Sequence, residues 1–349
     1  MDLVVLLVAL VIILVGAELF TNGIEWFGRK LQLAEGAVGS VLAAVGTALP
    51  ETMIPIIAIF FGGAESADAV GVGAILGAPF MLATLAMFVT GAAVLYAARH
   101  RPARDVMPVD THVLAHDMRY FAIGYAVAIG AAFLPTSLVV LKWVIAAGLI
   151  GMYAWYVKGH FDAEAAEATD ELAPLRLHRL DRRGHRLDPV EPRFRIVSAQ
   201  VLAALACIVA RAYVFVGAVE HLSTTLGVDE AILALVIAPI ATELPEKFNS
   251  IIWVRQGKDT LAMGNITGAM VFQSAIPTVV ALLFAADTWR ITEDSIVAFA
   301  SAGIAFLSSA AIFIPMARRG RLTGRSLLVG GVFYVGYLGL VGASVAGLV

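Results

Sequence analysis

The hexapeptides GTALPE (46–51) and ATELPE (241–246) each place a proline and then a glutamate within a long apolar segment. A proline inside a helix removes one amide donor and pushes away the carbonyl group one turn back. In lipid, a carbonyl oxygen freed in this way needs another partner, and a bound cation is such a partner. The two hexapeptides therefore predict a site for a positive ion.

The candidate ligands are the two glutamates and the carbonyl oxygens near the helix breaks. Glu51 and Glu246 would supply charged oxygens, and hard cations such as Ca²⁺ and Na⁺ bind in cages of carbonyl and carboxylate oxygens. The candidate carbonyl groups lie near Ala44, Thr47, Pro239 and Thr242. A charged side chain at the bilayer centre costs about 2.5–3.5 kcal/mol on insertion scales, so its default interpretation is functional. One such glutamate could be protonated or paired for structural reasons, but two at equivalent positions favour the cation site.

These residues lie in a chain whose composition is that of a polytopic helical membrane protein. Of the 349 residues, 60% are hydrophobic and 15% are charged, and the mean hydropathy is +0.87. The short alternating segments of a β-barrel are absent from the sequence. We interpret the first apolar segment as a retained span, because it lacks a basic n-region and a clear cleavage site. The single cysteine, Cys207, excludes an internal disulfide framework.

Ten apolar segments are long enough, or nearly so, to cross a bilayer. They cover residues 4–27, 35–61, 67–98, 119–134, 137–157, 197–223, 229–254, 259–285, 294–316 and 326–347. With the N-terminus outside, the loops after spans 1, 3, 5, 7 and 9 hold 20 of the 24 lysines and arginines. Basic loops stay in the cytoplasm, so we predict a multi-pass protein of the inner or plasma membrane with a cytoplasmic 158–195 loop.

The two halves of the chain align without a gap from Gly16 over Arg211 to the ends of the two hexapeptides, which indicates an internal repeat. We therefore divide the chain into a first repeat (1–157, motif 46–82), a linker (158–195) and a second repeat (196–349, motif 241–273). Five spans per repeat is an odd number, so the second copy enters the bilayer in the opposite orientation. Inverted repeats are typical of secondary transporters, whose sites lie near the membrane midplane.

At these motifs the sequence resembles the calcium/cation antiporter superfamily, the sodium/calcium exchangers. Their two repeats carry G-T-S-L-P-E followed by G-N-x-x-G-S, and here the copies read GTALPE with GAILGA and ATELPE with GNITGA. The resemblance implies ten helices in two inverted repeats and exchange of Na⁺ or H⁺ against Ca²⁺ by alternating access. It also implies that Glu51 and Glu246 are the acidic ligands and that Thr47 and Thr242 supply carbonyl and hydroxyl oxygens.

The chain departs from the family pattern at several side-chain ligands. Ala48 and Glu243 replace the serine after each threonine, and Gln273 stands where the family often has an acid. The serine of the second motif is alanine in both copies. Glu243 could act as a replacement ligand, or it could pair with Lys247 at the favourable four-residue spacing on a helix.

The function that this pattern favours is a secondary active cation antiporter, with Ca²⁺ as the substrate that the resemblance suggests and Na⁺ or H⁺ as the coupling ion. The alternative is a membrane protein that kept the fold but moves another cation or solute, or only binds a ligand or partner. We find no phosphate-binding loop, no nucleophile elbow and no HExxH motif in the sequence, so we do not predict an enzyme. We expect inorganic cations and the lipid bilayer as partners, no nucleic acid and no resident cofactor; the oligomeric state stays open.

Overall fold

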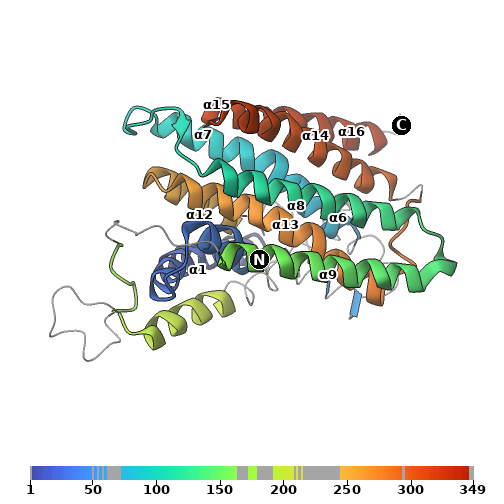
Figure 1. Cartoon of the computed structure of the whole chain (residues 1–349), viewed down its shortest axis with the longest axis horizontal. Helices are drawn as coiled ribbons and strands as arrows, with labels where there is room; N and C mark the ends of the chain where they lie inside the picture. Colours follow the sequence, from blue (N-terminus) through green and yellow to red (C-terminus); the bar gives the residue numbers. More distant parts are fainter. Residues whose placement is uncertain are drawn as a thin grey trace.

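The computed structural model describes residues 2–48, 51–52, 55–56, 59–60, 72–162, 172–178, 192–207, 210, 214, 244–292 and 295–345. In these ranges the chain is almost entirely helical, and most of the long helices run roughly along one axis of the molecule (Figure 1). Their bounds are α1 Asp2–Lys30, α2 Glu35–Ala37, η1 Val38–Ala43, α3 Ala44–Thr47, α6 Val72–Met81, η3 Leu82–Ala86, α7 Met87–Ala97, α8 Thr111–Gly130, η4 Ala131–Phe133, η5 Thr136–Leu138, α9 Val139–Phe161, α12 Leu244–Arg255, α13 Asp259–Phe284, α14 Ile296–Arg319, α15 Gly324–Leu327 and α16 Val329–Val345. A further apolar helix covers Phe194–Cys207.

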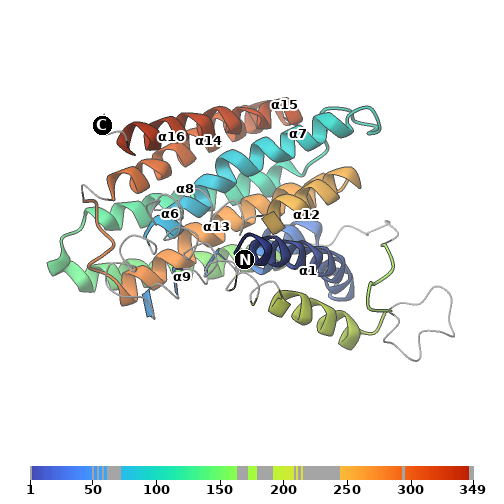
Figure 2. The same cartoon turned by 180° about the vertical axis from the view of Figure 1, so that it is seen from behind.

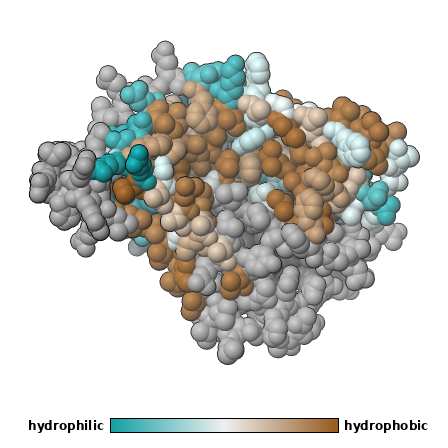
Figure 3. All heavy atoms as spheres, turned by 90° about the horizontal axis from the view of Figure 1, so that it is seen from below, coloured by the Kyte–Doolittle hydropathy of each residue, from teal (hydrophilic) through white to brown (hydrophobic). Residues whose placement is uncertain are grey.

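Five stretches of described helix are long and apolar enough to cross a membrane. They are Val72–Ala97, Thr136–Phe161, Asp259–Phe284, Ile296–Arg319 and Gly324–Ala343. The surface seen in Figure 3 is largely hydrophobic over its middle, and hydrophilic residues gather mostly toward its ends. Each of the ten predicted span ranges contains described helix, while the crossing of the membrane by all ten, and the inverted repeat, stay predictions.

The fourth span begins earlier than the sequence predicts. We expected a short span over 119–134, but α8 runs from Thr111 to Gly130. Asp110 caps it, because its carboxylate accepts hydrogen bonds from the backbone N–H groups of His112 and Val113. Arg119, which we expected in a cytoplasmic loop, therefore lies within a helix. The polar residues of its first half misled the hydropathy estimate, because their partners come from distant parts of the chain.

Helix α13 lies among elements of the first half of the chain. It packs against α8, α9, η1, α3 and α6, as well as against its neighbour α12 (Figures 1 and 2). The π-helical segment η1 crosses α13 at very close range: a Cβ atom added at Gly268 would lie 2.0 Å from the backbone oxygen of Ser40. A Cβ atom at Gly264 would lie 2.9 Å from the Ser40 hydroxyl oxygen. Two glycines one turn apart therefore make room for span 2 on the face of α13.

Loops that the topology places on one side of the membrane do meet. The antiparallel pair β1 (Val106–Met107) and β2 (Leu322–Thr323) joins the loop after α7 to the loop after α14. The guanidinium of Arg101 forms a buried ion pair with Asp259 and donates to the carbonyl of Val254. These contacts tie the loops after predicted spans 3, 7 and 9 together, while the side of the membrane on which they lie stays a prediction.

At the other end of the bundle, Lys142 near the start of α9 is fully buried. Its ammonium group donates to the carbonyl oxygens of Ala286 at 2.6 Å and Trp289 at 2.9 Å, in the loop after α13. The lysine therefore caps a turn between predicted spans 8 and 9. Among the described residues, the hydrogen bonds of its ammonium group go to this turn and not to the hexapeptides.

Candidate functional site

The chain is helical on both sides of the first hexapeptide's proline. Helix α3 ends at Thr47, residues 51–52 are again helical, and the backbone N–H of Thr52 donates to the carbonyl of Ala48 at 3.2 Å. Residues 49–50 lie outside the described residues. Thr47 and Glu51 are four residues apart in the sequence.

Both of these residues are removed from solvent. Thr47 is 0% exposed and Glu51 is 6% exposed. The Thr47 hydroxyl lies 3.0 Å from the carbonyl oxygen of Ala43 and 3.2 Å from the amide oxygen of Asn265 on α13. The hydroxyl of Thr47 and the amide of Asn265 thus meet between two helices, and the buried carboxylate of Glu51 follows four residues after Thr47.

The carbonyl of Ala44 is not freed by the helix break. It accepts the backbone N–H of Ala48 at 3.0 Å and lies 3.4 Å from the Thr47 hydroxyl. Its usual helical bond is therefore intact, and only its second lone pair is open to sharing.

Gln273 is buried in α13 and has no hydrogen-bond partner among the described residues. Its side chain is 1% exposed, and neither its amide oxygen nor its amide nitrogen makes a hydrogen bond there. A buried polar group without a partner is costly, so a binding site is one reason to keep it. The α13 residue that contacts Thr47 is Asn265, however, which lies eight residues before Gln273 on the helix.

The second hexapeptide lies largely outside the described residues. Pro239, Thr242 and Glu243 belong to the undescribed part of the chain, and Glu246 is described only as a backbone position in the first turn of α12. The choice between a ligand role for Glu243 and a pairing with Lys247 therefore stays open. One turn further along α12, Asn249 is fully buried and accepts a hydrogen bond from Thr21 of α1.

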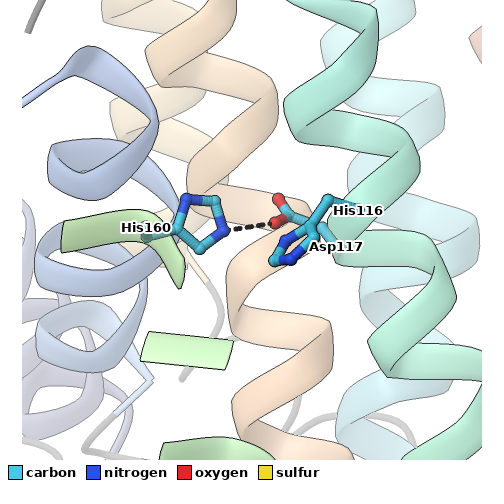
Figure 4. A group of neighbouring side chains, drawn as sticks. All are labelled: His116, Asp117 and His160. Atoms are coloured by element: carbon cyan, nitrogen blue, oxygen red, sulfur yellow. Dashed lines mark hydrogen bonds and ion pairs between the residues drawn. The ribbon is translucent and has the colours of Figure 1, made fainter. Parts of the chain in front are cut away.

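A buried carboxylate that the sequence analysis missed is Asp117 of α8. It is 0% exposed and accepts hydrogen bonds from side chains of three other elements. Figure 4 shows His160 of α9 pointing at this carboxylate, with His116 beside it. The predicted spans 67–98 and 119–134 leave Asp117 in a loop, and for this reason it is not among the candidate residues. The pair His116–Asp117 directly before an apolar run was the available signal.

Comparison with known proteins shows which family the chain belongs to. The family model described as "Sodium/calcium exchanger protein" matches residues 1–159 and 197–345. The chain belongs to the sodium/calcium exchanger family. The residues between the two matched stretches, 160–196, nearly coincide with the predicted linker, so sodium/calcium exchanger sequence lies on both sides of it.

A named relative and several solved structures resemble most of the chain. A protein named "Putative antiporter CaxA" from Alkalimonas amylolytica is 26% identical over 267 residues, which cover 76% of this chain and 75% of that protein. Structures of the sodium-calcium exchanger NCX_Mj, soaked with 2.5 mM Na⁺ and either 0.1 mM Ca²⁺ or 1 mM Sr²⁺, match with TM-scores of 0.68 and 0.69. Each match covers 97% of both chains at 15% identity, which establishes a common fold.

Proposed function

We propose that this protein is a secondary active cation antiporter that moves Ca²⁺ across the membrane in exchange for Na⁺ or H⁺ by alternating access. The observation that carries the proposal is the buried carboxylate of Glu51, which lies four residues after a buried threonine that contacts α13. Membership of the exchanger family and similarity to a protein named as an antiporter support it.

The chemistry of the described oxygens suits a hard cation. Glu51 supplies charge, Thr47 supplies a hydroxyl, and Asn265 supplies an amide oxygen. Ca²⁺ and Na⁺ prefer such oxygen ligands, and none of these three side chains offers a soft sulfur ligand. Glu246, from the second repeat, would be the matching acid on the opposite side of the ion.

The ligand set is compatible with either coupling ion. Gln273 and Ala269 are neutral and add no charge to the site, so Na⁺ or H⁺ would compete with Ca²⁺ for the carboxylates. A carboxylate can bind either a cation or a proton, so loading of Ca²⁺ and loading of H⁺ on Glu51 would exclude each other. Mutually exclusive loading gives exchange when the site opens to one side at a time and only the loaded protein changes sides.

The proposal is tested with the purified full-length protein in liposomes. Uptake of ⁴⁵Ca²⁺ is followed with an outward Na⁺ gradient, with an outward H⁺ gradient, and with neither. We expect uptake only when one of the two gradients is imposed. Equal uptake without a gradient would indicate a channel. No uptake of any tested cation by folded protein would contradict transport and favour a protein that keeps the fold to bind a ligand or partner.

The hydroxyl of Thr47 gives a prediction of moderate size. In Thr47→Val the side chain keeps its shape and loses one oxygen ligand, and we expect the half-saturating Ca²⁺ concentration to rise about tenfold, the size of one lost hydrogen bond or ligand. The matched control is Thr84→Val, because Thr84 is equally buried in η3 and bonds only to its own helix, at the carbonyl of Phe80. Equal effects of the two variants would show that Thr47 acts through helix stability alone.

A further inference from the structure

Asp117 has four separate hydrogen-bond partners. One carboxylate oxygen accepts from the hydroxyl of Ser40 at 2.8 Å and from the hydroxyl of Thr267. The other accepts from the hydroxyl of Tyr156 at 3.0 Å and lies 2.9 Å from Nε2 of His160. Each oxygen thus has two partners, as many as its two lone pairs allow.

The same arrangement argues against a metal centre. The ligand atoms of His116, Asp117 and His160 lie within 4.8 Å of one another, which resembles a three-ligand metal site. The carboxylate, however, has no lone pair left for an ion, because Ser40, Thr267 and two other donors occupy it. Binding a metal would require breaking several buried hydrogen bonds. The cluster is better explained as a connection between helices.

The helices that Asp117 connects are those that cross at the glycine contact. Ser40 lies in η1, where its backbone meets Gly268 of α13, and Thr267 is the neighbour of that glycine. Asp117 thus holds one hydroxyl from each side of the crossing on a single oxygen atom. Tyr156 donates to the same carboxylate and reaches the carbonyl of Ser40 at 3.2 Å, which anchors the crossing to α9.

The crossing and the candidate cation site lie on the same two helices. Thr47 is seven residues after Ser40, or about two helical turns, and Asn265 is two residues before Thr267. A shift of span 2 along α13 at the crossing would therefore move Thr47 relative to Asn265, since helices are stiff over two turns. The 3.2 Å contact between those two side chains depends on the register that the crossing sets.

We propose that Asp117 is a positioning residue for cation binding: it locks the register of span 2 on α13 and thereby sets the distance between the oxygen ligands on the two helices. This inference rests on the proposed function, because it assigns a role in the same site. Asp117 does not touch the ion. It acts through Ser40 and Thr267.

The decisive variants change Thr267, since loss of the whole carboxylate could unfold the protein. In ⁴⁵Ca²⁺ uptake by liposomes, Thr267→Val is expected to raise the half-saturating Ca²⁺ concentration about tenfold with a maximal rate within about twofold of wild type. Thr267→Ser restores the hydroxyl and should restore the affinity. The matched control is Thr278→Val, because Thr278 is equally buried in α13 and its hydroxyl, as far as the described residues show, bonds only within its own helix, at the carbonyl of Ser274.

A double-mutant cycle tests the route of the effect. Because Thr267 is proposed to act through Asp117, adding Thr267→Val to Asp117→Ala should change the affinity no further. Independent effects that add would overturn the proposal, as would equal affinities for Thr267→Val and Thr278→Val. Wild-type protein without gradient-driven uptake would overturn the proposed function instead.

The register of span 2 on α13 can also be tested without a transport assay. Hydrogen exchange of the backbone amides in 38–48 should rise in Thr267→Val and stay at the wild-type level in Thr278→Val. Unchanged exchange in this segment would overturn the role of Asp117 even if the protein transports.

Discussion

Glu51→Gln is expected to reduce gradient-driven Ca²⁺ uptake at least about 100-fold while the protein remains folded. The substitution removes the charge of a side chain that is only 6% exposed and keeps its size and its ability to hydrogen-bond. A divalent cation leaves water only when charged oxygens compensate for its lost hydration, and an amide oxygen carries no net charge. An effect of this size corresponds to about 3 kcal/mol, in the range measured for a lost partner of a buried charge.

The next residue provides the control for this variant. Thr52 is also buried, and its hydroxyl donates to the carbonyl of Ala48 at 2.8 Å. Thr52→Val perturbs the same helical turn without changing charge, and it should retain uptake within about threefold of wild type, as expected for one local hydrogen bond. If Glu51→Gln transported as well as Thr52→Val, the carboxylate would not be the cation ligand.

Gly268→Ala is expected to produce the largest loss of stability. The added Cβ atom would lie 2.0 Å from the backbone oxygen of Ser40 and 2.5 Å from its Cα atom, which is far inside van der Waals contact. Backbone atoms cannot rotate away as a side chain can, so η1 and α13 would have to separate. Overpacking of this kind typically costs about 1–3 kcal/mol and sometimes more. We expect the upper end of that range or beyond, together with loss of cation affinity.

The measurement is thermal unfolding of the purified protein in detergent, followed by tryptophan fluorescence. Gly303→Ala in α14 is the matched control, because a Cβ atom there would have nothing within 4 Å. That variant should unfold at the wild-type temperature or slightly above it, since alanine favours helix more than glycine does. If Gly268→Ala unfolded at the same temperature as Gly303→Ala, the close crossing of η1 and α13 would not exist in the protein.

Much of the fold could be predicted from hydropathy, because a lipid-facing helix must be apolar along its whole length. The eighth predicted span, 259–285, agrees with α13 to within one residue at each end. The predicted start of the fourth span was wrong because buried polar residues lie in a helix there. The first half of α8 carries His116, Asp117 and Arg119, and a hydropathy window counts these as loop residues. In the folded chain Asp117 is satisfied by partners 39 to 150 residues away, and no local pattern reports such partners.

In the candidate site, too, local features could be predicted from the sequence and contacts between distant residues could not. Glu51 and the carbonyl near Thr47 were predicted from a local motif, because a proline frees carbonyl oxygens beside the carboxylate that follows it, and the resemblance added the Thr47 hydroxyl. The structure confirms that both are buried, and it leaves their role as ligands a prediction. The contact of Thr47 with Asn265 could not be predicted, since it depends on the register between two helices 218 residues apart. The intact helical bond of the Ala44 carbonyl differs from the prediction because a proline removes the bond to the carbonyl four residues back, which for Pro50 is that of Gly46.

The most direct measurement is equilibrium binding of ⁴⁵Ca²⁺ to the purified protein in detergent, without any gradient, for wild type and Glu51→Gln side by side. We predict saturable binding to wild type that Na⁺ or acid displaces, and no saturable binding to Glu51→Gln. Binding of equal affinity in the two proteins would contradict a cation site at Glu51.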